Sequence, residues 1–177
     1  PLYFLFMRPW TAIVGSGDWS LRWPSLAFGV LSVPLLAYVT ARLAGRRAAL
    51  VGALLAACNP FLVWYGQEAR MYTLVGLLAL ASLAAVLWAR HLQSRRWWIA
   101  AGASAALALY THYWAGLLLL TLAAWAMVDL ATATGRERPR AARGWCLAAA
   151  ATLLAFAAWI PRALGVLGFG GWRAAQP

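Results

Sequence analysis

The residues with the most chemistry in this chain lie between Asn59 and Tyr72. The stretch reads Asn-Pro-Phe-Leu-Val-Trp-Tyr-Gly-Gln-Glu-Ala-Arg-Met-Tyr and separates two long apolar runs. It carries a carboxylate at Glu68, a guanidinium at Arg70 and phenols at Tyr65 and Tyr72. Ionisable groups among membrane helices are costly, and they commonly mark functional sites. This stretch, called the junction below, is therefore the first candidate for a site.

The helical period predicts that the junction is polar on two faces. If Glu68 begins a helix, about 100° per residue puts Tyr65, Glu68 and Tyr72 on one face and Arg70 on the opposite one. Neither face suits lipid, so we expect a cavity, a partner helix or headgroups beside them. A helix N-terminus favours an anion, and a guanidinium matches phosphate oxygens. The alternative is a Glu68–Arg70 pair that merely ends a span.

His112 is a second candidate, in the polar interruption Tyr-Thr-His-Tyr-Trp of residues 110–114. Its functional interpretation is an acid or base, a metal ligand or a phosphate contact near Glu68. The alternative is membership of an aromatic belt at the membrane surface. Glu68 and His112 alone are too few ligands for a metal, so no cofactor is assigned and a divalent metal stays open.

The elements that must position these side chains are membrane helices. The chain is 64% hydrophobic and 11% charged, whereas a soluble domain carries about 25% charged residues. Several apolar runs approach the roughly 20 residues that cross a bilayer. A net charge of +11 suggests nucleic acid, but the basic residues sit in short clusters between apolar runs and form no contiguous face. We expect an all-α, polytopic transmembrane helical bundle without a nucleic-acid partner.

About six spans are expected, after an N-terminal interfacial segment. As one helix, residues 97–130 would reach roughly 50 Å, too long for a hydrocarbon core of about 30 Å. Residues 1–23 are predicted to be an outer loop along the interface, residues 24–163 the transmembrane core, and residues 164–177 the start of the next outer loop. The predicted spans are 24–41, 48–64, 71–89, 97–111, 115–130 and 145–163.

Arginine positions predict the sidedness of the bundle. Six spans place all three arginine clusters on one side, which the positive-inside rule makes cytoplasmic. The junction and His112 then lie on the outer face. Asp129 and Glu137 fall among the cytoplasmic arginines and are interpreted as solvated or arginine-paired surface groups. The arginine-only, alanine-rich composition favours a GC-rich bacterial source, and the expected location of a multi-pass protein from such a source is the bacterial inner membrane.

Several motifs together resemble a known family. They are Pro-Leu-Tyr-Phe-Leu at residues 1–5, Gly-x-Gly-Asp-Trp-Ser-Leu-Arg-Trp-Pro-Ser at 15–25, Gly29, the junction, and Thr-His-Tyr at 111–113. Residues 1–130 are similar to GT-C fold membrane glycosyltransferases related to glycosyltransferase family 39, which include protein O-mannosyltransferases and the aminoarabinose transferases of lipid A. The junction resembles the bacterial branch.

The resemblance implies transfer of a sugar from a polyprenyl-phosphate-linked donor to a protein, lipid or polysaccharide acceptor on the periplasmic or extracellular face. Arg70 would contact the donor phosphate. Glu68 and His112 would contact acceptor, sugar or metal, with Tyr65 and Tyr72 as further substrate contacts. The family's catalytic carboxylate lies upstream of the Pro-Leu-Tyr motif. The chain is therefore expected to be a fragment that is inactive alone, and no residue in it is assigned as the base.

Two other functions compete with this interpretation. A transporter or flippase for lipid-linked sugars would also use polar groups at helix breaks, but near the bilayer midplane. Here the polar groups gather at one end of the predicted spans, which favours the enzyme. In a non-catalytic membrane subunit, Glu68 and Arg70 would be dispensable.

Overall fold

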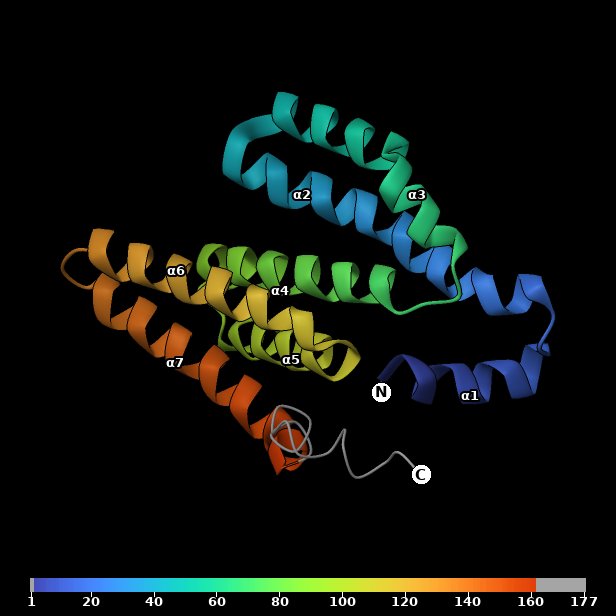
Figure 1. Cartoon of the computed structure of the whole chain (residues 1–177). Helices are drawn as coiled ribbons and strands as arrows, with labels where there is room; N and C mark the ends of the chain where they lie inside the picture. Colours follow the sequence, from blue (N-terminus) through green and yellow to red (C-terminus); the bar gives the residue numbers. More distant parts are fainter. Residues whose placement is uncertain (1, 162–177) are drawn as a thin grey trace, which may run out of the picture.

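The computed structural model describes residues 2–161 and shows an all-α chain (Figure 1). Within these residues there is no strand, which confirms the predicted class. The prediction for residues 164–177 lies outside the described part. The helices are α1 (Leu2–Val14), α2 (Asp18–Cys58), α3 (Pro60–Gln67), α4 (Tyr72–Leu92), α5 (Arg95–Thr111), α6 (Gly116–Thr132) and α7 (Glu137–Phe156), with 3-10 turns at Tyr113–Ala115 and Ala157–Trp159.

Large apolar side chains cover much of the outer surface, as expected of a protein surrounded by lipid. Within residues 2–161, four helical segments are long and apolar enough to cross a membrane, namely α2, α4, Tyr113–Thr132 and Glu137–Trp159. Exposed leucine and valine side chains occur on α2 and α6, and exposed leucines on α7, where a soluble protein would place polar groups. The chain is therefore a multi-pass membrane protein.

The count of four such helices in the described residues differs from the predicted six, for two physical reasons. The 41 residues of α2 include Gly45 with φ 87°, a left-handed conformation at which the chain folds back on itself (Figure 1). The 17 residues of α5 open with two arginines and fall short of a full crossing. A total of six spans is reached only if each of the two arms of α2 and the short α5 crosses the membrane by itself, and this assignment stays a prediction.

The second predicted span, residues 48–64, is not one continuous helix. α2 ends at Cys58, and the Asn59 side chain starts α3 anew, because its Oδ1 accepts the backbone N–H groups of Phe61 and Leu62 at 2.9 and 3.3 Å. Pro60 occupies the first helical turn, where its missing N–H costs nothing. The Asn59 cap thus divides into two helices an apolar run that hydropathy alone predicts to be one.

Small residues let the central helices approach closely. α4 packs between α2 and α5, and α5 packs in turn on α7. A Cβ on Gly102 of α5 would collide with the Ala148 backbone of α7, and one on Gly144 of α7 would collide with the Trp98 ring of α5. Close packing through small residues is how membrane helices gain contact energy without a hydrophobic drive between them.

The bundle has two chemically different ends. The turns at Gly45, between α4 and α5, and between α6 and α7 lie together at the left of Figure 1 and carry most of the arginines. We call this the basic end. The α3–α4 connection and the α5–α6 turn lie at the opposite end, called the junction end.

Helix α1 docks on the start of α2 at the junction end. Pro24 has no N–H for the Ser20 carbonyl four residues earlier, and the Trp10 indole of α1 donates to that carbonyl instead, at 2.6 Å. The Trp10 ring also stacks on Trp23, with centroids 5.8 Å apart. The predicted interfacial segment is therefore a helix paired with the first turns of α2, and its placement relative to a membrane stays a prediction.

Candidate functional site

The junction turns sharply between α3 and α4 rather than starting a helix at Glu68. Glu68 is extended, with φ −86° and ψ 137°, and α4 begins only at Tyr72. The prediction that residues 68–72 form a helical turn is wrong, so its assignment of faces does not apply. The physical reason is tertiary: the Ser25 hydroxyl of α2 donates to the Arg70 carbonyl at 3.0 Å. The Arg70 N–H bonds the Glu68 carbonyl at 2.8 Å.

Glu68 and Arg70 form an open pair. The Arg70 Nε and Glu68 Oε2 atoms are 3.7 Å apart, and the two side chains are 63% and 34% exposed. The other carboxylate oxygen, Oε1, accepts the Trp64 indole N–H at 3.0 Å. An exposed pair at this distance contributes little stability. The guanidinium therefore keeps most of its donors available to a ligand.

Three of the predicted residues meet in an aromatic row contributed by successive elements. The ring of Tyr65 in α3 lies 4.6 Å from that of Tyr72 in α4. The Tyr72 ring lies 5.9 Å from the imidazole of His112, at the C-terminus of α5. Phe61 extends the row on the Tyr65 side, at 4.5 Å. The structure thus brings Phe61, Tyr65, Tyr72 and His112 together in one row. Tyr65 and Tyr72 are neighbours as predicted, but not because they share one face of a continuous helix.

His112 has a defined hydrogen-bonding role. Its Nδ1 accepts the backbone N–H of Trp114 at 3.1 Å and so caps the following 3-10 turn. In the neutral ring the proton therefore resides on Nε2, which can donate to a ligand. This geometry favours a donor to an anion over a general base.

The N-terminus of α4 completes the anion-friendly surroundings of Arg70. No side chain caps it, since Met71 at the N-cap supplies no acceptor. Thr73, in the first turn, is 8% exposed, and its hydroxyl has no hydrogen-bond partner. An uncapped helix start with a partnerless buried hydroxyl leaves several donors unsatisfied.

Comparison with protein families decides what kind of protein places these groups together. Residues 1–161 match the model of the dolichyl-phosphate-mannose-protein mannosyltransferase family. The chain belongs to this family. No curated protein and no solved structure gave a significant match. Membership indicates a membrane glycosyltransferase, and the family's name specifies a lipid-phosphate-linked sugar as donor.

Metal ligands do not gather in the described part of this mannosyltransferase-family chain. Among residues 2–161, no three His, Cys, Asp or Glu side chains come together as a metal site requires. The polar groups of the junction end are instead donors: a guanidinium, an imidazole N–H, hydroxyls and helix amides. Such a set suits an anionic ligand.

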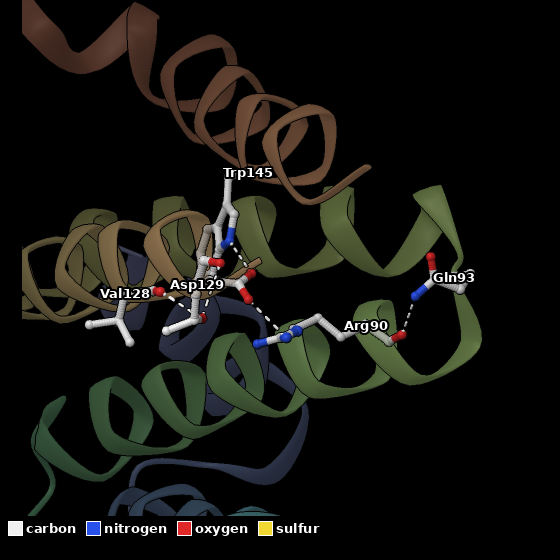
Figure 2. Close-up of polar contacts among 6 residues, drawn as sticks. Arg90, Gln93, Val128, Asp129 and Trp145 are labelled. Carbon is white, nitrogen blue, oxygen red and sulfur yellow. Dashed lines mark hydrogen bonds and ion pairs between the residues drawn. The ribbon is translucent and has the colours of Figure 1, made fainter. Parts of the chain in front are cut away.

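The basic end holds a second arginine–carboxylate pair, shown in Figure 2. Arg90 of α4 and Asp129 of α6 are 2.8 Å apart, and the Trp145 indole of α7 donates to the other Asp129 oxygen at 2.8 Å. Asp129 is 3% exposed. The prediction of an arginine-paired surface group was right about the pairing and wrong about the surface. Glu137, in the first turn of α7, is exposed as predicted.

Sequence reasoning missed three polar residues near the site: Tyr3, Ser25 and Thr73. Two of them belong to motifs already noted for the family resemblance, and that was the available signal. Their contacts join segments 22 and 45 residues apart in the chain, which no helical period reveals.

Proposed function

We propose that the chain is the donor-binding part of a glycosyltransferase that takes a sugar from a polyprenyl-phosphate carrier. The acceptor, a protein, lipid or polysaccharide, receives it on the periplasmic or extracellular face of a bacterial inner membrane. Family membership supports sugar transfer by a membrane enzyme. The concentration of arginines at the end away from the junction supports the assigned side.

One observation carries this proposal: the Arg70 guanidinium is exposed and weakly paired beside an uncapped helix start. Its partner Glu68 is 3.7 Å away, and no side chain caps α4. The positive end of α4 and a forked guanidinium both favour phosphate. A donor phosphate bound here would lie at the end of the helices, within reach of a lipid carrier in the bilayer.

The aromatic row supplies the remaining contacts. Tyr65 and Tyr72 present ring faces and hydroxyls, and His112 presents Nε2–H, which suits a sugar or its phosphate. Glu68, already bonded to Trp64 and paired with Arg70, suits an acceptor or sugar hydroxyl better than a metal ion. All of these groups lie at helix ends, which favours a transferase over a transporter with a midplane site.

The proposed reaction inverts the anomeric carbon. The acceptor's nucleophilic atom forms a bond to that carbon as the bond to the phosphate oxygen breaks, and a carboxylate takes the acceptor's proton. Arg70 and the α4 amides stabilise the charge that grows on the departing lipid phosphate. Neither Asp18 nor Glu68 is assigned as the base, since Asp18 sits in the first turn of α2 and Glu68 is held by its neighbours.

Replacing Arg70 tests the proposal. In the natural protein, reconstituted with polyprenyl-phosphate mannose as probe donor, Arg70→Ala is expected to lower transfer about 100-fold through loss of a charged phosphate contact. Arg70→Lys, which keeps the charge but loses the fork, should lie between. The matched control is Arg138→Ala at the exposed basic end, which should transfer normally. Normal transfer by a folded, membrane-inserted Arg70→Ala protein would overturn the phosphate assignment.

A further inference from the structure

Two linked hydrogen bonds, one buried and one part-buried, connect α1 to the backbone of the junction. The Ser25 Oγ atom donates to the Arg70 carbonyl at 3.0 Å, and the Tyr3 hydroxyl lies 3.1 Å from the same Oγ. A serine hydroxyl has one proton, which Ser25 gives to Arg70, so Tyr3 is the donor in the second bond. Donation therefore runs in one direction, from the Tyr3 hydroxyl to Ser25 and from the Ser25 hydroxyl to the Arg70 carbonyl.

Burial of the donors strengthens these two hydrogen bonds. Tyr3 is 2% exposed and Ser25 is fully buried. Water cannot replace a lost partner of the Ser25 hydroxyl, so removing the Tyr3 hydroxyl leaves Ser25 without its second hydrogen bond; the Arg70 carbonyl, in a part-buried bond, loses its only side-chain donor when Ser25 is removed. Consecutive hydrogen bonds in a low-dielectric setting also strengthen one another. The backbone of Arg70 is thus fixed from beneath, while its guanidinium stays exposed.

The docking of α1 holds Tyr3 in place for this task. Trp10 anchors the other half of α1 through the Ser20 carbonyl that Pro24 leaves without an intrahelical partner. The Phe6 ring contacts Phe28 of α2 at 5.6 Å. α1 is therefore held on α2 by contacts on either side of its middle, and Tyr3 reaches Ser25 from a rigid support.

We propose that Tyr3 and Ser25 are positioning residues for donor binding. They hold the Arg70 backbone so that the guanidinium and the α4 N-terminus address the same phosphate, and they make donor affinity depend on the docking of α1. This inference rests on the proposed function, in which Arg70 contacts the donor phosphate. It gives a role to Tyr3 of the Pro-Leu-Tyr-Phe-Leu motif, which the proposed reaction does not otherwise use.

Hydrogen exchange tests the positioning without any assay of activity. In the full natural protein in lipid nanodiscs, Tyr3→Phe and Ser25→Ala should each speed amide exchange across residues 68–75 about fivefold, as expected for loss of one buried hydrogen bond. The matched control is Tyr38→Phe. Tyr38 of α2 packs its ring on Trp88 of α4, so this variant also removes a tyrosine hydroxyl between the same two helices, but away from the junction. Unchanged exchange at residues 68–75 in both junction variants would overturn the proposal.

Kinetics test the coupling to donor binding. Tyr3→Phe and Ser25→Ala should raise the donor KM about fivefold, with kcat within about twofold of the natural protein, since the lost contact acts on binding. Because the two bonds are in series, the double variant should be no worse than Ser25→Ala alone. Tyr3→Phe should also add nothing in an Arg70→Ala background.

The two ways of failing are distinguishable. Faster exchange with an unchanged donor KM in Tyr3→Phe would overturn the coupling between α1 and the donor. If Arg70→Ala then also left the donor KM unchanged, the proposed function itself would be wrong. A KM increase that persists undiminished in the Arg70→Ala background would show that Tyr3 does not act through Arg70, and would overturn the inference.

Discussion

The basic end and the junction end each hold an arginine–carboxylate pair, and the two pairs differ in distance, burial and partners. Arg90 and Asp129 are 2.8 Å apart, and the carboxylate is 2% exposed with a second donor in Trp145. Arg70 and Glu68 are 3.7 Å apart and partly exposed. The first pair joins three helices, whereas the second spans three residues of one connection.

The difference shows how the same chemistry serves two purposes. A buried carboxylate is tolerated only when every oxygen is satisfied, and Asp129 meets this requirement with Arg90 and Trp145. Such a closed set offers nothing to a ligand. Arg70 is held by its backbone and left open at its side chain, so its donors remain available. The comparison supports the proposal that the basic end is structural and the junction end binds the donor.

Removing the buried carboxylate should have the largest effect on stability. Asp129→Ala leaves the Trp145 indole without its acceptor, while Arg90, whose side chain is 46% exposed, can turn to solvent, and the change is expected to cost about 3 kcal/mol of unfolding free energy. Thermal unfolding in detergent measures the loss. Glu137→Ala, at the exposed first residue of α7, is the control and should shift stability by less than about 0.5 kcal/mol. Equal effects of the two variants would break the comparison.

Filling the space beside Trp98 should come next. Gly144→Ala forces a methyl group into the Trp98 ring, one residue from Trp145, and overpacking of this kind costs about 1–3 kcal/mol. Gly76→Ala in α4, where an added Cβ meets nothing within 4 Å, is the matched control. A smaller loss for Gly144→Ala than for Gly76→Ala would contradict the close α5–α7 packing.

The aromatic row should affect binding rather than stability. His112→Asn keeps a side-chain acceptor for the Trp114 N–H but removes the Nε2 donor, and it should weaken donor binding by about 1 kcal/mol. Titration of the donor into the nanodisc-embedded natural protein gives the affinity. Unaltered affinity would remove His112 from the site and return it to the aromatic belt.

Loosening the junction pair should matter least for folding. Glu68→Gln removes the charge while keeping an oxygen for Trp64, and it should change unfolding free energy by less than about 1 kcal/mol. Thermal unfolding beside Asp129→Ala makes the comparison direct. A loss as large as that of Asp129→Ala would mean that the junction pair is structural after all.

Apolar runs and their punctuation were enough to predict an all-α membrane protein, because lipid admits few other backbones. The type and neighbourhood of Glu68, Arg70 and His112 likewise pointed to the junction end. The turn at residues 68–71 was not predictable from local pattern, since a hydroxyl 45 residues away holds the Arg70 carbonyl. The burial of Asp129 was missed for the same reason: nearby arginines suggested solvent, whereas its partners come from α4 and α7.

The most direct test of the account is donor binding and thermal unfolding measured together on Arg70→Ala in the natural protein. The account predicts at least about tenfold weaker binding of the polyprenyl-phosphate donor, from the loss of a charge-assisted contact, with a melting temperature that stays within the scatter of the Arg138→Ala control. A lowered melting temperature with undiminished donor binding would contradict the division of roles between the two ends.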